Sequence, residues 1–195
     1  LEILKNTFTK SRGMKNPGLI ISGTGSYLPG KPVFNKELID RFSLNTSDEW
    51  IQENLGIQKR HFADKGIGAS VLGFEAAKIA SKNAGITPKD LDRILFCSST
   101  GDWTSPASAC NVQALLGADC PSEDKQAACS SFIYGLEHGA RLIATGLNHV
   151  LVIGSDVKSR FVKTDDLRLM PIFADGAGAV VLSPYDKESG LLGCE

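Results

Sequence analysis

One segment of the sequence combines a cysteine with the small neighbours and the helix start that nucleophilic chemistry needs. It reads Gln126-Ala127-Ala128-Cys129-Ser130-Ser131-Phe132, and a helical pattern follows from Cys129 to Thr145. Small neighbours let a substrate approach the sulfur closely. Free N–H groups and the positive dipole end of a helix stabilise a thiolate, and they also stabilise the oxyanion formed when a thiolate attacks a thioester. The segment favours Cys129 as a nucleophile, although a free cysteine is also typical of a packed core.

The three histidines do not offer that cysteine a general base. In one continuous helix His138 would lie ~13.5 Å from Cys129 along the axis and roughly 180° around it, so the two side chains face opposite sides. His149 opens a strand at the far end of the same helix, and His61 belongs to the basic stretch Gln58-Lys59-Arg60-His61, typical of a surface or packing position. We therefore expect the base to be missing from these 195 residues.

The other cysteines show no comparable setting. Cys97 lies in an apolar strand and is expected in the core, and the remaining three are interpreted as structural or incidental: Cys110, Cys120 and Cys194. The total of five is odd and no C-x-x-C spacing occurs, which argues against a zinc site and against a disulfide framework. Free thiols are typical of a cytoplasmic protein.

Composition excludes several classes of partner. The net charge of −1 gives no electrostatic footprint for nucleic acid or an anionic membrane surface. No run of ~20 apolar residues is present to span a bilayer. Leu1 to Gly13 lacks the apolar core of a secretory signal and is interpreted as a leader or an added segment, expected to be disordered, before a natural start at Met14. Residues 14–195 are expected to form one domain.

The spacing of apolar and turn-forming residues predicts alternating strands and helices. We expect strands over residues 19–22, 93–97, 149–153, 171–174 and 177–182, and helices over 35–42, 50–56, 70–84, 106–116 and 129–145. Thr46 begins a Thr-x-x-Glu capping box. The glycines in Gly23-Thr24-Gly25 and Asp175-Gly176-Ala177-Gly178-Ala179 are interpreted as tight turns rather than nucleotide-binding loops. The alternation predicts a layered α/β domain.

Four ordered segments within Leu19 to Pro184 resemble the β-ketoacyl-acyl-carrier-protein synthase III family. Cys129 lies in the second, similar to the family's active-site segment, usually Ala-Ala-Cys-Ala/Ser-Gly-Phe. The four are Thr46-Ser47-Asp48-Glu49-Trp50-Ile51 with Gly56-Ile57 and Arg60-His61, then Ala127 to Leu136, Val152-Ile153-Gly154-Ser155-Asp156, and Phe173-Ala174-Asp175-Gly176-Ala177-Gly178-Ala179.

The resemblance implies the first of two similar halves of a thiolase-like fold, with a central mixed sheet, in a homodimer. It implies that Cys129 takes an acyl group from acyl-CoA. Malonyl-acyl-carrier protein would then lose CO2, and the resulting carbanion would attack the acyl thioester. By the same resemblance Trp50 stacks on the CoA adenine and Thr46 helps to hold the nucleotide end. No metal or redox cofactor is implied.

Three positions depart from the family pattern. Asn54 stands where an arginine often assists CoA binding, and Arg168 lies near the place of another CoA-contacting arginine. Ser105 stands before Pro106, where some members carry a phenylalanine that shortens the partner subunit's acyl pocket. Its small side chain predicts room for a primer longer or bulkier than acetyl.

The family's catalytic histidine and asparagine lie in its second half, which explains the missing base. We therefore expect these 195 residues by themselves to be inactive in condensation. Two alternatives stay open: a thiolase-fold acyltransferase that loads another nucleophile, and a non-catalytic half-chain partner of another thiolase-fold protein. The second alternative gives no reason for a thiol at the start of a helix.

Overall fold

A central five-stranded mixed sheet organises the computed structural model, which describes residues 18–163, 166 and 168–186. The proposed leader and Cys194 lie outside the described residues. The strand order is β1-β7-β6-β4-β5; β4 is parallel to β5 and β6, and β7 is antiparallel to β6 and β1. The strands are β1 (Leu19–Tyr27), β4 (Arg93–Cys97), β5 (Ser122–Lys125), β6 (Val150–Val157) and β7 (Asp175–Pro184).

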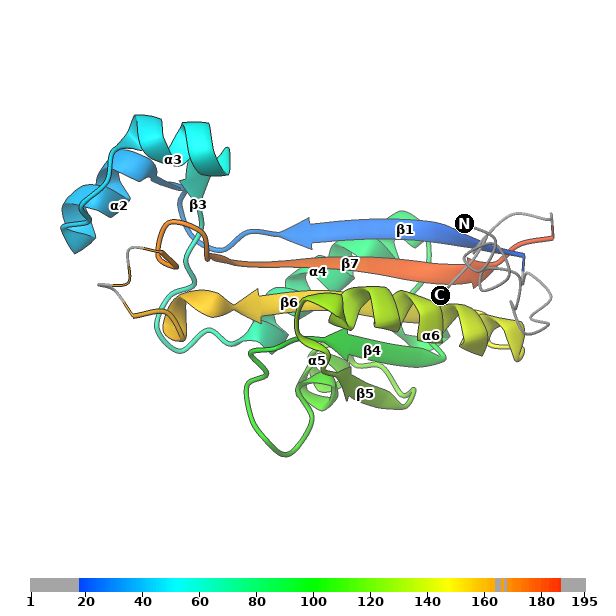
Figure 1. Cartoon of the computed structure of the whole chain (residues 1–195). Coiled ribbons are helices and arrows are strands. Elements are labelled where there is room, and N and C mark those ends of the chain that lie inside the picture. The colour runs from blue at the N-terminus through cyan, green and yellow to red at the C-terminus, as the bar shows by residue number, and fades with distance from the viewer. Residues whose placement is uncertain (1–17, 164–165, 167, 187–195) are drawn as a thin grey trace, which may run out of the picture.

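Helices cover both faces of this sheet (Figure 1). Helices α4 (Ala69–Ala84) and α5 (Ser108–Leu116) pack on one face, and α6 (Ser131–Ala144) packs on the other. The connection from β4 to β5 runs through α5, and the return from β5 to β6 crosses β4 through α6. Right-handed crossovers in opposite directions place their helices on opposite faces. The predicted layered α/β domain with a central mixed sheet is confirmed.

Side chains alternate between the two faces and so build two cores. On the β4 strand, Phe96 packs toward α4 and Cys97 packs toward α6, and both are buried. A strand buried on both sides has no polar face, which explains the continuous apolar run Ile94-Leu95-Phe96-Cys97. The predicted strand over 93–97 is confirmed.

A small lobe lies beyond one end of the sheet, at the upper left of Figure 1. It contains the antiparallel pair of short strands β2 (Val33–Phe34) and β3 (Lys59–Arg60), with helices α2 (Asn35–Phe42) and α3 (Asp48–Leu55) between them in the chain. Leu38 and Leu44 form part of its own small core with Val33 and Met170. The described residues also form three short 3₁₀ turns: η1 (Pro88–Asp90), η2 (Ala128–Ser130) and η3 (Lys158–Arg160).

Both predicted glycine turns are wrong. The glycines at 23 and 25 lie within β1, and those at 176 and 178 lie within a continuous β7, while 171–174 forms no strand. A Cβ added at Gly23 would overlap the Ala80 carbonyl of α4, and one at Gly25 would overlap that of Ala76. These two glycines therefore let a helix backbone lie directly on a strand, which is the close approach that the sequence suggested, without the turn.

Helix starts also differ from the sequence-based expectation. Ser47, rather than Thr46, caps α3 by accepting a hydrogen bond from the Trp50 N–H at 3.1 Å. Helix α5 begins at Ser108 and has no local side-chain cap; instead the Asp124 carboxylate accepts hydrogen bonds from the Ser108 and Ala109 N–H groups, each at 2.8 Å. Because Asp124 lies on β5, this cap forms only in the folded structure.

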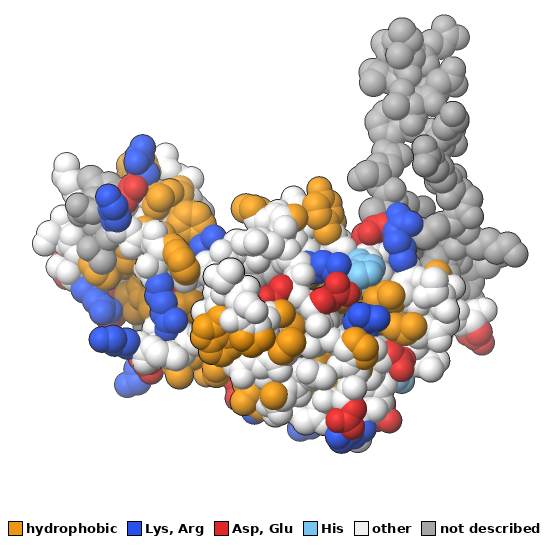
Figure 2. Space-filling model, turned by 90° about the horizontal axis from the view of Figure 1, so that it is seen from below, with side chains coloured by type: hydrophobic (Ala, Val, Ile, Leu, Met, Phe, Trp, Pro, Cys, Tyr) orange, Lys and Arg blue, Asp and Glu red, His pale blue; other side chains and the backbone are white. Residues whose placement is uncertain are grey.

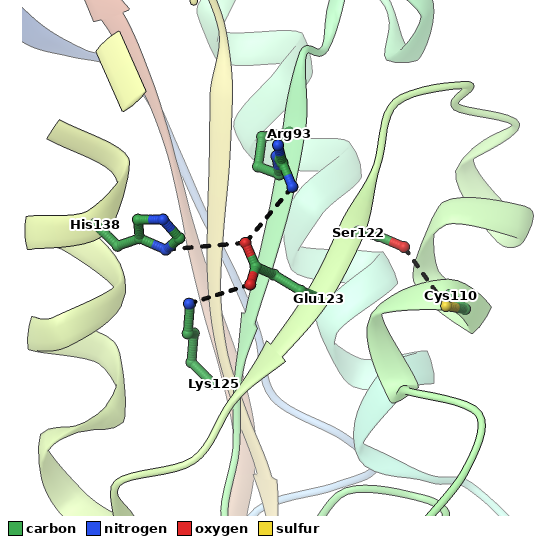
Figure 3. Close-up of polar contacts among 6 residues, drawn as sticks. All are labelled: Arg93, Cys110, Ser122, Glu123, Lys125 and His138. Atoms are coloured by element: carbon green, nitrogen blue, oxygen red, sulfur yellow. Dashed lines mark hydrogen bonds and ion pairs between the residues drawn. The ribbon is translucent and has the colours of Figure 1, made fainter. Parts of the chain in front are cut away.

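Strand β5 was not predicted because its residues are polar. Its Glu123 carboxylate points toward α6 and meets Arg93 at 3.7 Å, Lys125 at 3.1 Å and the His138 imidazole at 3.9 Å (Figure 3). On the other side of the strand, Ser122 contacts Cys110 of α5. An edge strand can carry charge in this way because its outer side is not enclosed by the sheet.

Candidate active site

Cys129 lies in a hollow at the end of the sheet where the parallel strands β4 and β6 finish. The hollow has a volume of about 390 Å³. It is lined by residues from the β1, β4, β6 and β7 strand ends and from the segment that leads into α6: Leu28, Cys97, Ala128, Cys129, Ser131, Phe132, Gly154, Ser155, Asp156, Ala174, Gly176, Ala177 and Gly178. The carboxyl ends of parallel strands are the usual place for ligands in α/β sheets.

Cys129 occupies the η2 turn directly before α6, rather than the first turn of the helix itself. Its side chain is exposed. The preceding residue, Ala128, has a φ of +49°, in the left-handed region that costs a residue with a Cβ roughly 1–2 kcal/mol. A strained residue beside an exposed thiol indicates that the backbone holds that thiol in a particular position.

Cys97 lines the same hollow but has a different environment. It is 2% exposed, and burial raises the pKa of its thiol to about 12. It packs against the α6 backbone at Gly135, where an added Cβ would overlap its sulfur. Cys97 is therefore a packing residue, as its apolar surroundings in the sequence indicated.

Two glycines allow large side chains to pack closely at the hollow. A Cβ added at Gly154 would lie 3.1 Å from the Phe132 ring, and one at Gly176 would lie 3.3 Å from the Leu28 side chain. Both distances are tighter than ordinary van der Waals contact. The family-like segments Val152 to Asp156 and Phe173 to Ala179 thus let the Phe132 and Leu28 side chains, which also line the hollow, pack directly on their backbone.

Asp156 fixes the loop that follows β4 at the end of β6. One carboxylate oxygen, Oδ1, accepts four hydrogen bonds from three successive residues: Ser98 Oγ at 3.2 Å, Ser99 N at 2.9 Å, Ser99 Oγ at 3.1 Å and Thr100 Oγ1 at 2.7 Å. Thr100 Oγ1 in turn accepts from the Val157 N–H at 2.8 Å. Because this carboxylate also lines the hollow, it ties the position of the loop to the site.

Asp175 makes a similar connection at the start of β7. It is 3% exposed, and its two oxygens accept hydrogen bonds from Ser159 N at 2.9 Å, Ser159 Oγ at 2.6 Å and Ala63 N at 2.8 Å. Its own N–H donates to the His61 carbonyl oxygen. The segment after β3 and the segment after β6 are therefore joined beside the hollow.

All three histidines lie outside this hollow. The ring Nδ1 of His61 contacts the Pro29 carbonyl oxygen at 2.9 Å, and that of His149 contacts Ser183 Oγ at 3.0 Å. His138 faces Glu123 across the gap between α6 and β5 (Figure 3). Among the residues that the structure describes, Cys129 has no histidine beside it in the hollow.

The other predicted site residues lie away from Cys129. Thr46 and Trp50 belong to the small lobe, with the Trp50 side chain half-exposed at the start of α3. Ser105 is exposed in the loop before α5, and Arg168 is exposed beside Asp166, with which it pairs. None of the four lines the hollow.

Arg60 holds two of these outlying segments together beneath the small lobe. It is 4% exposed, and its Nη2 donates to Asn35 Oδ1 at 2.6 Å and to the Pro171 carbonyl oxygen at 3.2 Å. Asn35 in turn donates to Asp48 at the start of α3. Burial lowers the pKa of Arg60, partly offset by the charge of Asp48. The α3 segment and the segment after Arg168 therefore share one buried anchor.

Sequence reasoning missed the supporting residues of the site. Asp156 and Asp175 lie in the family-like segments. Apart from Ser159, the residues that hydrogen-bond to these two carboxylates lie 56 or more residues away in sequence, and only the fold brings them together. Ser131 also lines the hollow, and no sequence signal distinguished it from Ser130.

Comparison with known proteins identifies relatives of this chain. Residues 124–195 match the family model described as 3-oxoacyl-[acyl-carrier-protein] synthase III. A β-ketoacyl-[acyl-carrier-protein] synthase III of Sphingopyxis alaskensis is 46% identical over 169 residues, which are 86% of this chain and 52% of that protein. The chain thus spans about half the length of the relative.

Solved structures show the same relationship. The 3-oxoacyl-[acyl-carrier-protein] synthase III of Aquifex aeolicus matches with a TM-score of 0.82 and 38% identity, over 87% of this chain and 55% of that one. The priming β-ketosynthase of the R1128 polyketide pathway matches with a TM-score of 0.83 and 30% identity, over 91% and 53%.

The fold thus matches about half of the thiolase-like 3-oxoacyl-[acyl-carrier-protein] synthase III structures. The chain belongs to the β-ketoacyl-acyl-carrier-protein synthase III family, of whose members it spans about half. Within the described residues, no helix is long and apolar enough to cross a membrane.

Proposed function

We propose that the protein carrying this chain is a cytoplasmic enzyme that condenses an acyl group from acyl-CoA with malonyl-acyl-carrier protein, with Cys129 as the acyl carrier. This reaction would start fatty-acid chains or related secondary-metabolite chains. The observation that carries the proposal is an exposed cysteine in a strained turn before a helix, beside a glycine-walled hollow, in a chain of this family.

The first half of the reaction follows from the position of that cysteine. The Cys129 thiolate attacks the acyl-CoA carbonyl carbon, a tetrahedral oxyanion forms, and the CoA thiolate leaves, so that one thioester replaces another. The start of α6 presents N–H groups and a positive dipole end beside the developing negative charge. The hollow beside Cys129 is the proposed space for the acyl chain.

The second half of the reaction needs groups that we assign to the other half of the family's fold. Malonyl-acyl-carrier protein loses CO2, and its carbanion attacks the Cys129 thioester, which releases the cysteine thiolate and forms a β-ketoacyl-acyl-carrier protein. The histidine and asparagine that the resemblance implies would activate the malonyl thioester. The placement of His61, His138 and His149 away from the hollow supports this division.

The small lobe is the proposed contact for the CoA nucleotide. Trp50 is half-exposed and presents an aromatic face on which adenine can stack, and Thr46 lies just before the same helix. Arg168 is an exposed cation in the segment joined to α3 through Arg60. Asn54, whose side chain donates to the Trp50 carbonyl oxygen at 2.9 Å, offers no charge there.

A homodimer is the proposed assembly. Strand β5 is an edge of the sheet, and large hydrophobic side chains are exposed on the helices around it, including Ile133 and Tyr134 on α6 and Leu115 on α5. Figure 2, which faces the side where α5 and β5 lie, shows hydrophobic side chains in several surface groups. A second copy would cover them, and sedimentation equilibrium would measure whether the mass is twice that of one chain.

The condensation itself is tested with malonyl-acyl-carrier protein and a panel of acyl-CoA donors. We expect β-ketoacyl-acyl-carrier protein and CO2 from the native protein, and no condensation product from Cys129→Ala. The control is Cys110→Ala, since Cys110 lies outside the hollow. Condensation that continues in Cys129→Ala would contradict the proposal.

A further inference from the structure

The turn that carries Cys129 is closed by a neighbouring side chain, Ser131. Its hydroxyl oxygen accepts a hydrogen bond from the Ala127 N–H at 2.7 Å, and the same hydroxyl donates to the Ala128 carbonyl oxygen at 2.8 Å. The hydroxyl thereby links the 126–127 peptide unit to the 128–129 peptide unit and closes the backbone around Ala127 and Ala128, the residue with the left-handed φ of +49°.

Ser131 is placed for this contact by the start of α6. Its residue is 3% exposed and is the first residue of the helix, so its side chain cannot turn away to water. Its backbone N–H also donates to the Ala128 carbonyl oxygen, which therefore receives two hydrogen bonds from one residue. Ser130, one residue earlier, is exposed and makes no side-chain hydrogen bond within the described structure.

We infer that Ser131 is a positioning residue that holds Ala128 in its left-handed conformation and thereby fixes the Cys129 sulfur at the hollow. This inference rests on the proposed function, because it assigns the fixed position to the acyl acceptor. Without the hydroxyl, Ala127 loses its acceptor, and Ala128 is free to relax toward the right-handed conformations that alanine prefers. Cys129, the next residue, moves with it.

The family pattern limits how much acyl transfer should slow when the Ser131 hydroxyl is removed. The similar segment usually has glycine at this position, and a glycine cannot form the two side-chain hydrogen bonds. Loss of the hydroxyl is therefore expected to slow acyl transfer rather than to abolish it. We expect Ser131→Ala to lower the maximal rate of Cys129 acylation about fivefold, which corresponds to about 1 kcal/mol, with the half-saturating acyl-CoA concentration unchanged.

The experiment combines rapid-quench acylation with hydrogen exchange on the protein that carries this chain. Acetyl-CoA is the donor, and intact-mass spectrometry measures the acyl-enzyme formed with time in the native protein, Ser131→Ala and the control Ser130→Ala. Hydrogen exchange of the peptide that covers residues 126–132 measures whether Ala127 N–H becomes less protected. Faster exchange with slower maximal acylation in Ser131→Ala alone is the expected result.

A double-mutant cycle separates positioning from general damage. Glycine adopts positive φ without strain, so Ala128→Gly removes much of the reason for the hydroxyl contact. We expect the effect of Ser131→Ala on the maximal rate to be about twofold in the Ala128→Gly background, against about fivefold in the native one. An equal loss in both backgrounds, or unchanged exchange and rate in Ser131→Ala, would overturn the inference.

Failure of the proposed function gives a different result. If the native protein takes no acyl group from any acyl-CoA, the proposed function is contradicted. The hydrogen-exchange comparison does not depend on acyl transfer, and unchanged protection of Ala127 in Ser131→Ala would contradict the contact itself.

Discussion

Cys97 and Cys129 line the same hollow, but the fold gives them opposite environments. Cys97 ends β4, is 2% exposed, and has its thiol pKa raised to about 12 by burial. Cys129 lies outside the sheet in a turn before α6, and its side chain is exposed. Residue type and distance from the hollow therefore do not decide which thiol can react; the backbone element that carries each thiol does.

The two cysteines are also held by different means. Cys97 is fixed by apolar packing between β6 and α6, where Val152 and Gly135 lie against it. Cys129 is fixed by hydrogen bonds to the backbone on either side of Ala128. Packing suits a residue that must stay enclosed, whereas a turn leaves the thiol open to a substrate.

The largest predicted difference is in alkylation. At pH 8 a thiol with a pKa of about 12 carries a thiolate in about one molecule in 10,000, and burial also excludes the reagent. Treatment of the folded protein with iodoacetamide should modify Cys129 and leave Cys97 unmodified, as measured by peptide mass spectrometry. Raising the pH should increase Cys97 alkylation, since more thiolate forms as the pH approaches 12. Equal modification of both thiols at pH 8 would contradict the expected difference in reactivity between Cys129 and Cys97.

Packing around Cys97 should respond to a helix substitution. Gly135→Ala places a Cβ against the Cys97 sulfur and should lower the free energy of unfolding by about 1–3 kcal/mol. Adding Cys97→Ala removes the sulfur and should recover part of that loss in urea unfolding.

Gly139→Ala is the matched control for this rescue. Its Cβ would meet Leu182 at 2.7 Å instead of Cys97, so Cys97→Ala should not recover its stability. Recovery of both glycine variants would show that the sulfur of Cys97 is not the obstacle.

Loss of the Asp156 hydrogen bonds should lower the free energy of unfolding nearly as much as Gly135→Ala does. Asp156→Ala leaves the Ser99 N–H and three hydroxyls without their acceptor, and the free energy of unfolding should fall by about 2 kcal/mol. Asp156→Asn keeps a carbonyl oxygen and should lose less. The comparison predicts that alkylation of Cys129 survives in both folded variants, because its turn is held by Ser131. Loss of Cys129 alkylation in folded Asp156→Asn would contradict that separation.

Substitution of Ser105 has the smallest expected effect, and this effect is on the choice of acyl-CoA. Since the resemblance assigns this position to the partner subunit's acyl pocket, Ser105→Phe should shift the preference for acyl-CoA toward short chains, by about tenfold in relative kcat/KM. Thr104→Phe, at the neighbouring exposed position, is the control. Unchanged chain-length preference in Ser105→Phe would show that Ser105 does not determine the acyl-chain specificity.

Elements with a strong periodic signal were predictable from the sequence. The helices at 35–42 and 70–84 and the strand at 93–97 have the expected positions; each helix has one apolar face, and the strand is apolar on both faces because it lies between two cores. The polar edge strand β5 escaped prediction, because Glu123 and Asp124 serve ion pairs and a helix cap instead of a core. Glycine occurs both in turns and where two backbones pack closely, and a sequence does not distinguish the two cases. Gly23 lies where α4 packs on β1 and not in a turn.

The site was predictable only in part. The Cys129 segment was recognisable because its small residues and following helix are contiguous in sequence. Asp156 was not assigned a role, because the hydroxyls that it binds follow another strand, 56 to 58 residues earlier. Arg60 lies in a family-like segment, and its burial and its hydrogen bonds to Asn35 and Pro171 depend on the fold.

The most direct test of the account is to map where an acyl group is attached. The protein is incubated with a panel of acyl-CoA donors, quenched in acid and digested, and the acylated peptide is sequenced by mass spectrometry in the native protein and in Cys129→Ala. The account predicts a thioester on the peptide that contains Cys129, none on the peptide that contains Cys97, and no adduct in the variant. An acyl group on Cys97, or an adduct that persists in Cys129→Ala, would contradict it.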